Sequence, residues 1–233
     1  MNRDIAAILE DQKAYYSQRA GEYDEWFHRL GRYDRGEDHN RDWFSEIALM
    51  RESLAGAAPF GDVLEFAAGT GLWTAELQKG ARSVHCLDAS SEVLEINRDR
   101  NGGSGIHFEA ADIFAWKPDR KFDFVFFSFW LSHVPEEKFA SFWDLVRAAL
   151  KPDGRWFMID SRPDEFSRAI DHRITPDTDI VRRKLNDGSE FDIVKRFFQT
   201  DELEERLARL GWRSEFAVTP RFFIYGSGKP SDY

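Results

Sequence analysis

Three acidic side chains each follow a short apolar run, and they are the residues of this sequence best placed to bind a ligand. Glu65 lies near the end of VLEF, Asp88 ends SVHCLD, and Asp112 comes just after GIHFEA. Taken singly, each carboxylate could be solvated, cap a helix or form a turn. Three acids after three successive runs favour a site for a ligand with hydroxyl or positively charged groups, because one carboxylate accepts several hydrogen bonds.

The stretch EFAAGTG, from Glu65 to Gly71, is a loop of small residues that lets a ligand approach the backbone. A P-loop is excluded, because no Lys-Ser or Lys-Thr pair follows the glycines. The dinucleotide pattern G-x-G-x-x-G fits poorly, since Thr74 stands at the third small position and Glu65 would repel a pyrophosphate. The acid therefore favours a ligand that carries a positive charge, and no phosphate, at this end.

The elements that must hold these residues alternate from residue 61 onward. We expect strands over 61–66, 83–88, 105–110, 122–129 and 155–160, and helices over 71–80, 90–101 and 136–150. Such apolar strands suit a parallel sheet that is covered on both faces. The last two strands, 212–218 and 221–227, are too close for a crossover helix and must be antiparallel.

The fold class predicted is therefore α/β, a Rossmann-like doubly wound, seven-stranded, mainly parallel sheet with an antiparallel last strand. Two helices are expected before it, over 4–20 and 39–56. We interpret residues 1–56 as an N-terminal helical lid and 57–233 as the sheet domain, with an insert at about 163–199 that has a turn at NDGS. Ligands bind at the carboxyl ends of the strands in such sheets.

With the elements in this order, EFAAGTG resembles motif I of the class I S-adenosylmethionine-dependent methyltransferases, D/E-x-G-x-G-x-G. Ala67 replaces the first glycine, which we expect to be tolerated at a negative φ. The resemblance extends over residues 12–228 and includes the LKPDG turn and the closing antiparallel pair. It implies S-adenosylmethionine as the cofactor.

The resemblance also implies which residues contact this cofactor. Asp88 would accept hydrogen bonds from the ribose hydroxyls, with Ala89 beside the adenine, whose edge Asp112 and Ile113 would bind. Glu65 would lie near the ammonium group. The other cofactor contacts implied by the resemblance are Phe66, Ala67, Gly69, Thr70, Gly71, Trp73, Ala111, Ser128 and Phe129.

The segment YYSQRAGEYDEWF resembles the Y-x-x-x-A-x-x-Y-D element that covers the cofactor in small-molecule enzymes of this family. Tyr16, Ala20, Tyr23 and Asp24 match it. Tyr23 is expected near the sulfonium, which also makes it a candidate catalytic residue, and Arg19 near the methionine carboxylate. The alternative interpretation is an amphipathic helix whose tyrosines belong to the core.

Methyl transfer needs a base only if the acceptor starts protonated. His133, just past the fourth strand, is the first candidate for this role and for a cofactor contact, because histidine titrates near neutral pH. Asp160 is the second candidate and His28 the third. An alternative role for His133 is a hydrogen bond to the backbone.

Aromatic side chains are expected to line the acceptor pocket: Trp26, Phe27, Trp130, Phe166, Phe197 and Phe198. Such a pocket favours a small, partly apolar acceptor such as a polyketide, indole, quinone or acid metabolite. Whether O, N or C is methylated stays open. So do two alternative functions, a nicotinamide-dependent oxidoreductase and a cofactor-bound protein that does not methylate.

Composition narrows the possible partners. The formal net charge is −10 and Lys and Arg form no runs, which argues against a nucleic-acid substrate. No cluster of His, Cys and acids has metal-ligand spacing, so no metal is expected, and the lone Cys86 has no partner for a disulfide. No apolar stretch approaches the ~20 residues of a membrane helix. We expect a cytoplasmic monomer or homodimer that does not associate with membranes.

Overall fold

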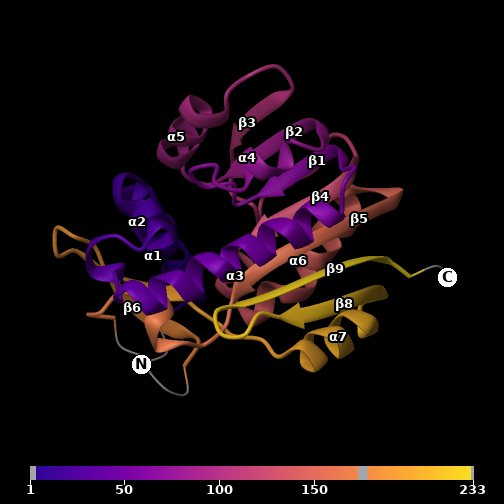
Figure 1. Ribbon diagram of the computed structural model, residues 1–233. Coiled ribbons are helices and arrows are strands. Elements are labelled where there is room, and N and C mark those ends of the chain that lie inside the picture. Colours follow the sequence, from indigo (N-terminus) through magenta and orange to yellow (C-terminus); the bar gives the residue numbers. More distant parts are fainter. Residues whose placement is uncertain (1–3, 173–177, 232–233) are drawn as a thin grey trace.

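Seven strands form one sheet through the middle of the computed structural model, which describes residues 4–172 and 178–231 (Figure 1). The spatial order is β3-β2-β1-β4-β5-β9-β8, and β9 is antiparallel to both of its neighbours while the other pairs are parallel. This confirms the predicted sheet. The strands are β1 (Gly61–Phe66), β2 (Ala81–Asp88), β3 (Ile106–Ala110), β4 (Phe122–Ser128), β5 (Leu150–Ser161), β8 (Trp212–Val218) and β9 (Phe223–Pro230).

Burial of both sheet faces explains the nearly continuous apolar sequence of β4. Successive side chains of a strand point to opposite faces. Phe124 and Phe126 accordingly join the core on one face, and Val125 and Phe127 join the core on the other. Because both faces of the strand are buried, none of these positions faces solvent, and the sequence of the strand is almost continuously apolar.

Helices supply the other half of each core. On one face, α3 contributes Trp43, Ile47, Met50 and Leu54, and it lies across the sheet in Figure 1. On the other face, α6 and α7 pack their apolar sides against the strands. The helices of this part are α3 (Glu37–Gly56), α4 (Thr74–Leu77), α5 (Ser91–Asn101), α6 (Glu136–Ala149) and α7 (Thr200–Arg209). In the described residues, none of the helices has the length and hydropathy needed to cross a membrane.

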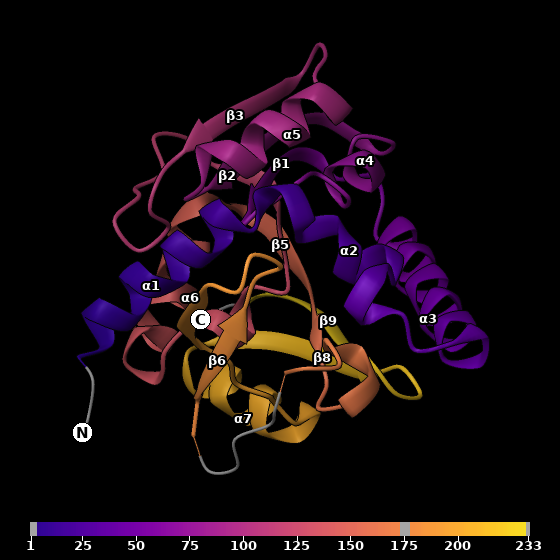
Figure 2. The same ribbon diagram turned by 90° about the vertical axis from the view of Figure 1, so that its left-hand side faces the viewer.

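The N-terminal elements lie beside a second, two-stranded sheet. They are α1 (Ile5–Gln18), η1 (Ala20–Glu22), α2 (Tyr23–His28) and η2 (Gly31–Tyr33), and the small sheet pairs β6 (Ile180–Lys184) with β7 (Glu190–Val194). Tyr15 of α1 packs against Val181, Leu185 and Ile193 of this hairpin. In Figure 2, α1, α2 and β6 lie in front of the central strands.

The hairpin was not predicted, although the NDGS turn was. Its two strands pair in register from Ile180 with Val194 to Lys184 with Glu190. The predicted helix over 71–80 is also shorter than expected, since α4 covers only Thr74–Leu77. Ala67, Gly69 and Gly71 take left-handed backbone conformations that a helix cannot contain, and they shape the site described next.

Candidate functional site

The loop after β1 alternates between ordinary and left-handed residues. Ala67, Gly69 and Gly71 have φ values of 51°, 53° and 85°. The expectation that Ala67 has a negative φ is therefore wrong: the position of the first motif glycine is left-handed like the other two. An L-residue in this region costs roughly 1–2 kcal/mol, so the loop carries local strain at Ala67.

Gly71 is needed for packing of the loop against α5. A Cβ at this position would lie 2.2 Å from Oδ1 of Asn97, and the side-chain amide of Asn101 donates to the Gly71 carbonyl across 2.8 Å. At Gly69, by contrast, a Cβ would meet the Tyr23 ring only at 3.7 Å. The two glycines therefore have different neighbours, a helix beneath the loop and the N-terminal segment above it.

Asp88 ties this loop to the end of β2. One carboxylate oxygen accepts the Gly69 N–H and the other accepts the Ser90 N–H, each across 2.9 Å. Burial raises the pKa of this carboxyl, and these backbone hydrogen bonds act against that rise. Since each carboxylate oxygen has a second acceptor direction, Asp88 can still receive two neighbouring hydroxyl groups of a ligand.

A first cavity, here called the loop cavity, lies beside residues 67–69. Of the predicted cofactor contacts, those lining it are Tyr16, Tyr23, Ala67, Gly69, Asp88, Ala89, Asp112, Ile113, Ser128, Phe129 and His133. Asp112 lies there with one oxygen on the Phe114 N–H at 2.9 Å and the other 2.7 Å from Nζ of Lys13 in α1. The ends of β1, β2, β3 and β4 thus converge, as the sequence predicts for a parallel sheet.

A second cavity of about 430 Å³, here called the basic cavity, adjoins the first. Four residues line both: Tyr16, Tyr23, Phe129 and His133. Phe129 has a φ of 52°, a costly conformation for a bulky side chain. Its ring packs edge-on against Trp26 at 4.8 Å between centroids, so the strained residue lies where the two cavities meet.

His133 is held in one tautomer at this junction. Its Nδ1 lies 2.6 Å from the carbonyl oxygen of Val194, which can only accept, so Nδ1 carries the proton. Burial, reinforced by Lys195, lowers the pKa of His133 well below its usual range, so the ring is neutral. The remaining lone pair on Nε2 accepts the Tyr16 hydroxyl at 2.8 Å. In this arrangement His133 orients Tyr16, and its basic nitrogen is already occupied.

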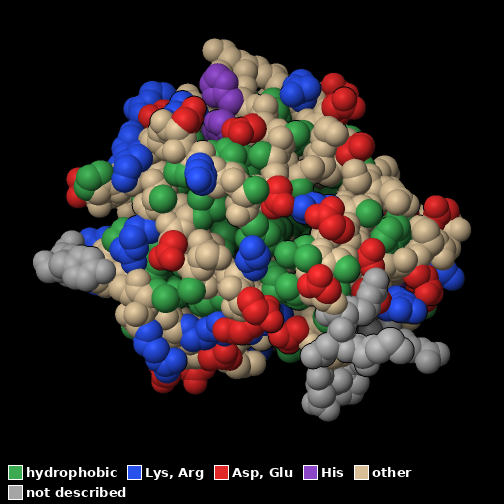
Figure 3. Space-filling model, turned by 180° about the vertical axis from the view of Figure 1, so that it is seen from behind, with side chains coloured by type: hydrophobic (Ala, Val, Ile, Leu, Met, Phe, Trp, Pro, Cys, Tyr) green, Lys and Arg blue, Asp and Glu red, His purple; other side chains and the backbone are tan. Residues whose placement is uncertain are grey.

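The basic cavity carries positive charge from Arg19, Arg168, Arg183 and Lys195. The acids in its described lining are already paired: Asp164 with Arg221 at 3.2 Å and Asp179 with Arg196 at 3.1 Å. Burial lowers the pKa of Arg183 and of Lys195, which shows how poorly these charges are solvated. Figure 3 shows acidic and basic side chains interspersed on the face drawn there, without an extended patch of either sign.

Lys195 has one buried anionic neighbour. Its Nζ lies 3.6 Å from Asp160 and 2.8 Å from the Ser132 hydroxyl. Asp160 is fully buried and also accepts the N–H groups of Ser132 and Ser161 at 2.8 and 2.7 Å. The other three cations form no ion pair with a described carboxylate, so the cavity keeps a net positive charge.

Known proteins resemble this chain in sequence and in fold. The family model of a methyltransferase domain matches residues 63–154. A solved complex of DhpI with S-adenosylhomocysteine (SAH) is 36% identical over 97% of this chain and 98% of that one, with a TM-score of 0.79. The chain is a class I S-adenosylmethionine-dependent methyltransferase. A second DhpI complex, with S-adenosylmethionine and a ligand abbreviated HEP, matches at 35% identity with the same TM-score.

Curated relatives match this methyltransferase over a shorter range. A phosphoethanolamine N-methyltransferase of Triticum aestivum is 30% identical over 132 residues, 54% of this chain and 26% of the relative. An uncharacterised methyltransferase of Staphylococcus carnosus is 32% identical over 122 residues, 52% of this chain and 56% of that one. The matches thus span about a quarter and about half of these relatives' lengths.

Some predicted cofactor contacts of the methyltransferase lie elsewhere. Glu65 is buried, and its carboxyl accepts the Thr74 hydroxyl at 2.6 Å and the Cys86 thiol at 3.6 Å, so it does not line the loop cavity. Burial raises its pKa to about 8. Phe66 packs in the core against Trp116 and Phe142. Three other predicted contacts, Thr70, Gly71 and Trp73, line a small pocket beside the loop that shares residues such as Tyr23 and Phe129 with the loop cavity. Ala111 packs against the core on one face of the sheet.

The predicted acceptor residues are also divided. Trp26 and Phe197 line the basic cavity, Trp130 lines the loop cavity, and Phe27 lines the small pocket beside the loop. Phe198 is buried against Phe139. Phe166 stacks on His39 at 4.0 Å between centroids, outside the basic cavity. Arg19 does line the basic cavity, donating to the Tyr33 hydroxyl at 3.3 Å.

Two of the three candidate bases, Asp160 and His28, line neither the loop cavity nor the basic cavity. Asp160 is sealed behind Lys195, and His28 is an exposed residue that contacts Phe27. Arg168, Arg183 and Lys195 were not predicted from the sequence. Arg183 lies on strand β6 of the hairpin and Lys195 directly follows β7, and the β-branched residues of IVRRK and EFDIV on either side of the NDGS turn were the signal that could have revealed this hairpin.

Proposed function

We propose that this methyltransferase methylates an oxygen of a small anionic acceptor, a molecule that bears a carboxylate or phosphoryl group and binds in the basic cavity. The supporting observation is the set of four cations there, three of them without a carboxylate partner among the described residues, in a chain with a formal net charge of −10. Placing positive charge in a partly buried cavity costs free energy that an anionic ligand recovers.

The cations are of the type that suits such a group. Arginine presents several N–H groups in a fixed fork that matches the oxygens of a carboxylate or phosphoryl group. Arg183 lies on β6, Arg168 on the segment after β5, and Lys195 just after β7, so they approach the cavity from three segments. An acceptor bound among them lies next to Tyr16, Tyr23, Phe129 and His133, which also line the loop cavity.

The residues of the loop cavity fit S-adenosylmethionine. Asp88 can accept two neighbouring hydroxyl groups. Asp112 and Ile113 line the same cavity, and the aromatic ring of Tyr23 can stabilise a positive charge. When bound, the cofactor supplies a methyl group whose bond to sulfur breaks as the bond to the acceptor oxygen forms, the electron pair returning to sulfur. The chain has to place the acceptor and to exclude water.

An acceptor oxygen that is already ionised needs no base, which agrees with the bound state of His133 and Asp160 among the described residues near the junction of the two cavities. Carboxylates and phosphoryl groups lose their protons well below neutral pH, so their oxygens need no proton acceptor. The lone pair of His133 is occupied by Tyr16, and Asp160 is bound by two N–H groups. His133 then orients Tyr16, and Asp160 holds Lys195 in place.

A second candidate is methylation of nitrogen in a molecule that also carries an anionic group. The name of the wheat relative, a phosphoethanolamine N-methyltransferase, raises it. An ammonium group must lose a proton before its nitrogen can attack the methyl group. The cations among the described residues of the basic cavity cannot accept that proton. We therefore favour oxygen.

The experiment is a methyl-transfer screen with labelled S-adenosylmethionine. It compares small carboxylic, phosphonic and phosphoric acids with their uncharged amides or esters, and with amines that carry a phosphate. We expect label in at least one acid and in none of the uncharged partners. Label in uncharged acceptors, or on amine nitrogen alone, would refute the proposal. Cofactor binding without transfer to any acceptor class would support the non-methylating alternative.

A further inference from the structure

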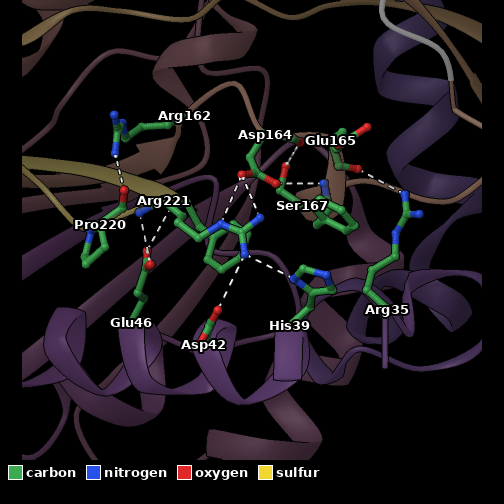
Figure 4. Close-up of polar contacts among 12 residues, drawn as sticks. Arg35, His39, Asp42, Glu46, Arg162, Asp164, Glu165, Ser167, Pro220 and Arg221 are labelled. Atoms are coloured by element: carbon green, nitrogen blue, oxygen red, sulfur yellow. Dashed lines mark hydrogen bonds and ion pairs between the residues drawn. The ribbon is translucent and has the colours of Figure 1, made fainter. Parts of the chain in front are cut away.

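Four consecutive backbone carbonyls, from Glu165 to Arg168, each accept a hydrogen bond from a side chain of residues 26–35. Arg35 donates through Nη2 to the carbonyls of Glu165 and Arg168, both at 3.0 Å. Trp26 donates to Ser167 at 2.6 Å, and Arg29 donates to Phe166 and Ser167. Figure 4 shows Arg35 reaching toward this segment, here called the 164–168 segment.

The opposite side of this segment is fixed by the β8–β9 connection. Asp164 pairs with Arg221, which also contacts His39 at 3.1 Å and Asp42 at 3.5 Å on α3 (Figure 4). Glu46 of α3 accepts the N–H of Arg221 at 3.0 Å. The segment thus takes its shape mainly from side chains of other elements.

This shape matters because the segment forms a wall of the basic cavity. Pro163, Asp164, Ser167 and Arg168 line it, while Arg35 does not. Arg35 bridges the first and last carbonyls of the turn that ends at Arg168. No other described hydrogen bond holds the Arg168 carbonyl. Without the bridge, the backbone at Arg168 would be less fixed, and the Arg168 guanidinium would sample more positions.

We propose that Arg35 is a positioning residue that fixes Arg168 against the acceptor by bridging the Glu165 and Arg168 carbonyls. The inference rests on the proposed anionic acceptor and deepens it: the recognition of the anion depends on a residue outside the cavity. It also gives arginine a reason to stand at position 35, because its long side chain carries two N–H groups on Nη2 that donate to two carbonyls at once.

A charge effect must be separated from this positioning role. Arg35 is close enough to Arg168 to contribute to lowering the pKa of Arg168, after burial and Arg183. It would therefore also attract an anion at long range. Lysine at position 35 keeps the charge, but its side chain is shorter and lacks the rigid plane that directs the two N–H groups of Nη2. A purely electrostatic role therefore predicts full binding in Arg35→Lys, whereas positioning predicts only partial recovery.

The test measures binding of inorganic phosphate to the SAH-saturated protein by isothermal titration at fixed ionic strength. The variants are Arg35→Ala, Arg35→Lys, Arg168→Ala and the double Arg35→Ala/Arg168→Ala. Arg41→Ala is the matched control, since Arg41 is an exposed arginine at the start of α3 that pairs with Asp38. SAH affinity, measured in parallel, reports the integrity of the fold.

We expect Arg168→Ala to weaken phosphate binding about tenfold, the loss of a charge-assisted hydrogen bond. Arg35→Ala should weaken it several-fold, Arg35→Lys less, and the double variant no more than Arg168→Ala, while Arg41→Ala and all SAH affinities stay unchanged. Wild-type binding in Arg35→Ala, full recovery in Arg35→Lys, or additive losses in the double variant would overturn the inference.

Failure of the proposed function has a different signature. If the wild type binds no phosphate and Arg168→Ala changes nothing, the anionic acceptor is refuted and the role of Arg35 falls with it. If Arg168→Ala weakens binding while Arg35→Ala does not, the acceptor class stands and only the positioning role is refuted.

Discussion

The hydroxyl of Tyr16 donates to Nε2 of His133 across 2.8 Å, and both residues line the two cavities. This contact joins α1 to η3 (Leu131–His133), the turn that follows β4. His133 is further bound by the Val194 carbonyl, so one ring connects the N-terminal helix, the central sheet and the hairpin. The junction between the two cavities is therefore assembled from three segments that are distant in the sequence.

Replacing Tyr16 by Phe tests this connection. The change leaves Nε2 of a buried, neutral His133 without a donor, which costs roughly 1–3 kcal/mol of stability. We expect a lower midpoint in urea unfolding and a several-fold lower kcat. Tyr225→Phe, on the partly buried β9, is the control and should leave both unchanged. Unaltered stability in Tyr16→Phe would mean that the contact does not hold the junction.

The neutral state of His133 makes a prediction about pH. Its pKa is held well below the usual range because the ring is buried, so the neutral form persists as pH falls below 6.5. The initial rate of methyl transfer to a carboxylate acceptor, which ionises well below this range, should then show no ionisation near pH 6.5. A rate that rises through that pH in the wild type but not in His133→Gln would indicate that His133 is a base after all.

Ala67 offers a test of the loop strain. Glycine at this position removes the left-handed penalty but adds freedom to the unfolded chain, so we expect Ala67→Gly to stabilise the protein by about 0.5–1 kcal/mol. The neighbouring Ala68 is not left-handed, and Ala68→Gly should destabilise it. Chemical denaturation of both variants measures the difference, and equal losses would contradict the assigned backbone of the loop.

Glu65 should make stability depend on pH. Burial raises its pKa from 4.5 to about 8 in the folded protein. Between these values the native state holds a proton that the unfolded state has released, so this contribution is present at low pH and is lost as pH rises. Urea unfolding at pH 5.5 and 8 should show a smaller decline in Glu65→Gln than in the wild type or in Glu52→Gln, an exposed control. Parallel declines would place Glu65 in solvent.

Arg183 and its neighbour allow a matched test of the acceptor site. Arg183 lines the basic cavity, while Arg182 on the same strand is exposed and pairs with Asp192 at 2.9 Å. We expect Arg183→Gln to raise the KM for an acid acceptor about tenfold with SAH affinity unchanged, and Arg182→Gln to have no effect on either. Steady-state kinetics and titration with SAH give the two values. Similar KM values in both variants would remove Arg183 from the site.

The parts of this account that sequence alone predicts share a physical cause. The run FDFVFFS predicts a central strand because residues buried on both faces leave no polar position, and acids after successive parallel strands must meet at one edge of the sheet. Asp88 and Asp112 were placed in this way. Ala89 and Ile113 were implied by the family resemblance, and they line the same cavity.

Other features depend on contacts that no local pattern records. Alanine at position 67 suggested a negative φ, but the backbone of the loop is set by Asp88 and by α5, whose asparagines lie against Gly71. Glu65 was expected at the ligand, yet Thr74 and Cys86 enclose it. Three cations of the basic cavity, Arg168, Arg183 and Lys195, come from the 164–168 segment, the hairpin and the residue after it, whose positions follow from tertiary contacts with α1 and residues 26–35.

The proposed transfer of the methyl group to an ionised oxygen is tested by the position of that methyl group in the product. The measurement is nuclear magnetic resonance of the product formed with carbon-13-methyl S-adenosylmethionine and an acid acceptor from the screen. We expect the label in a methyl ester, on carboxylate or phosphoryl oxygen, in a product with one negative charge fewer than the acceptor. A label on nitrogen, carbon or an uncharged hydroxyl oxygen would contradict it.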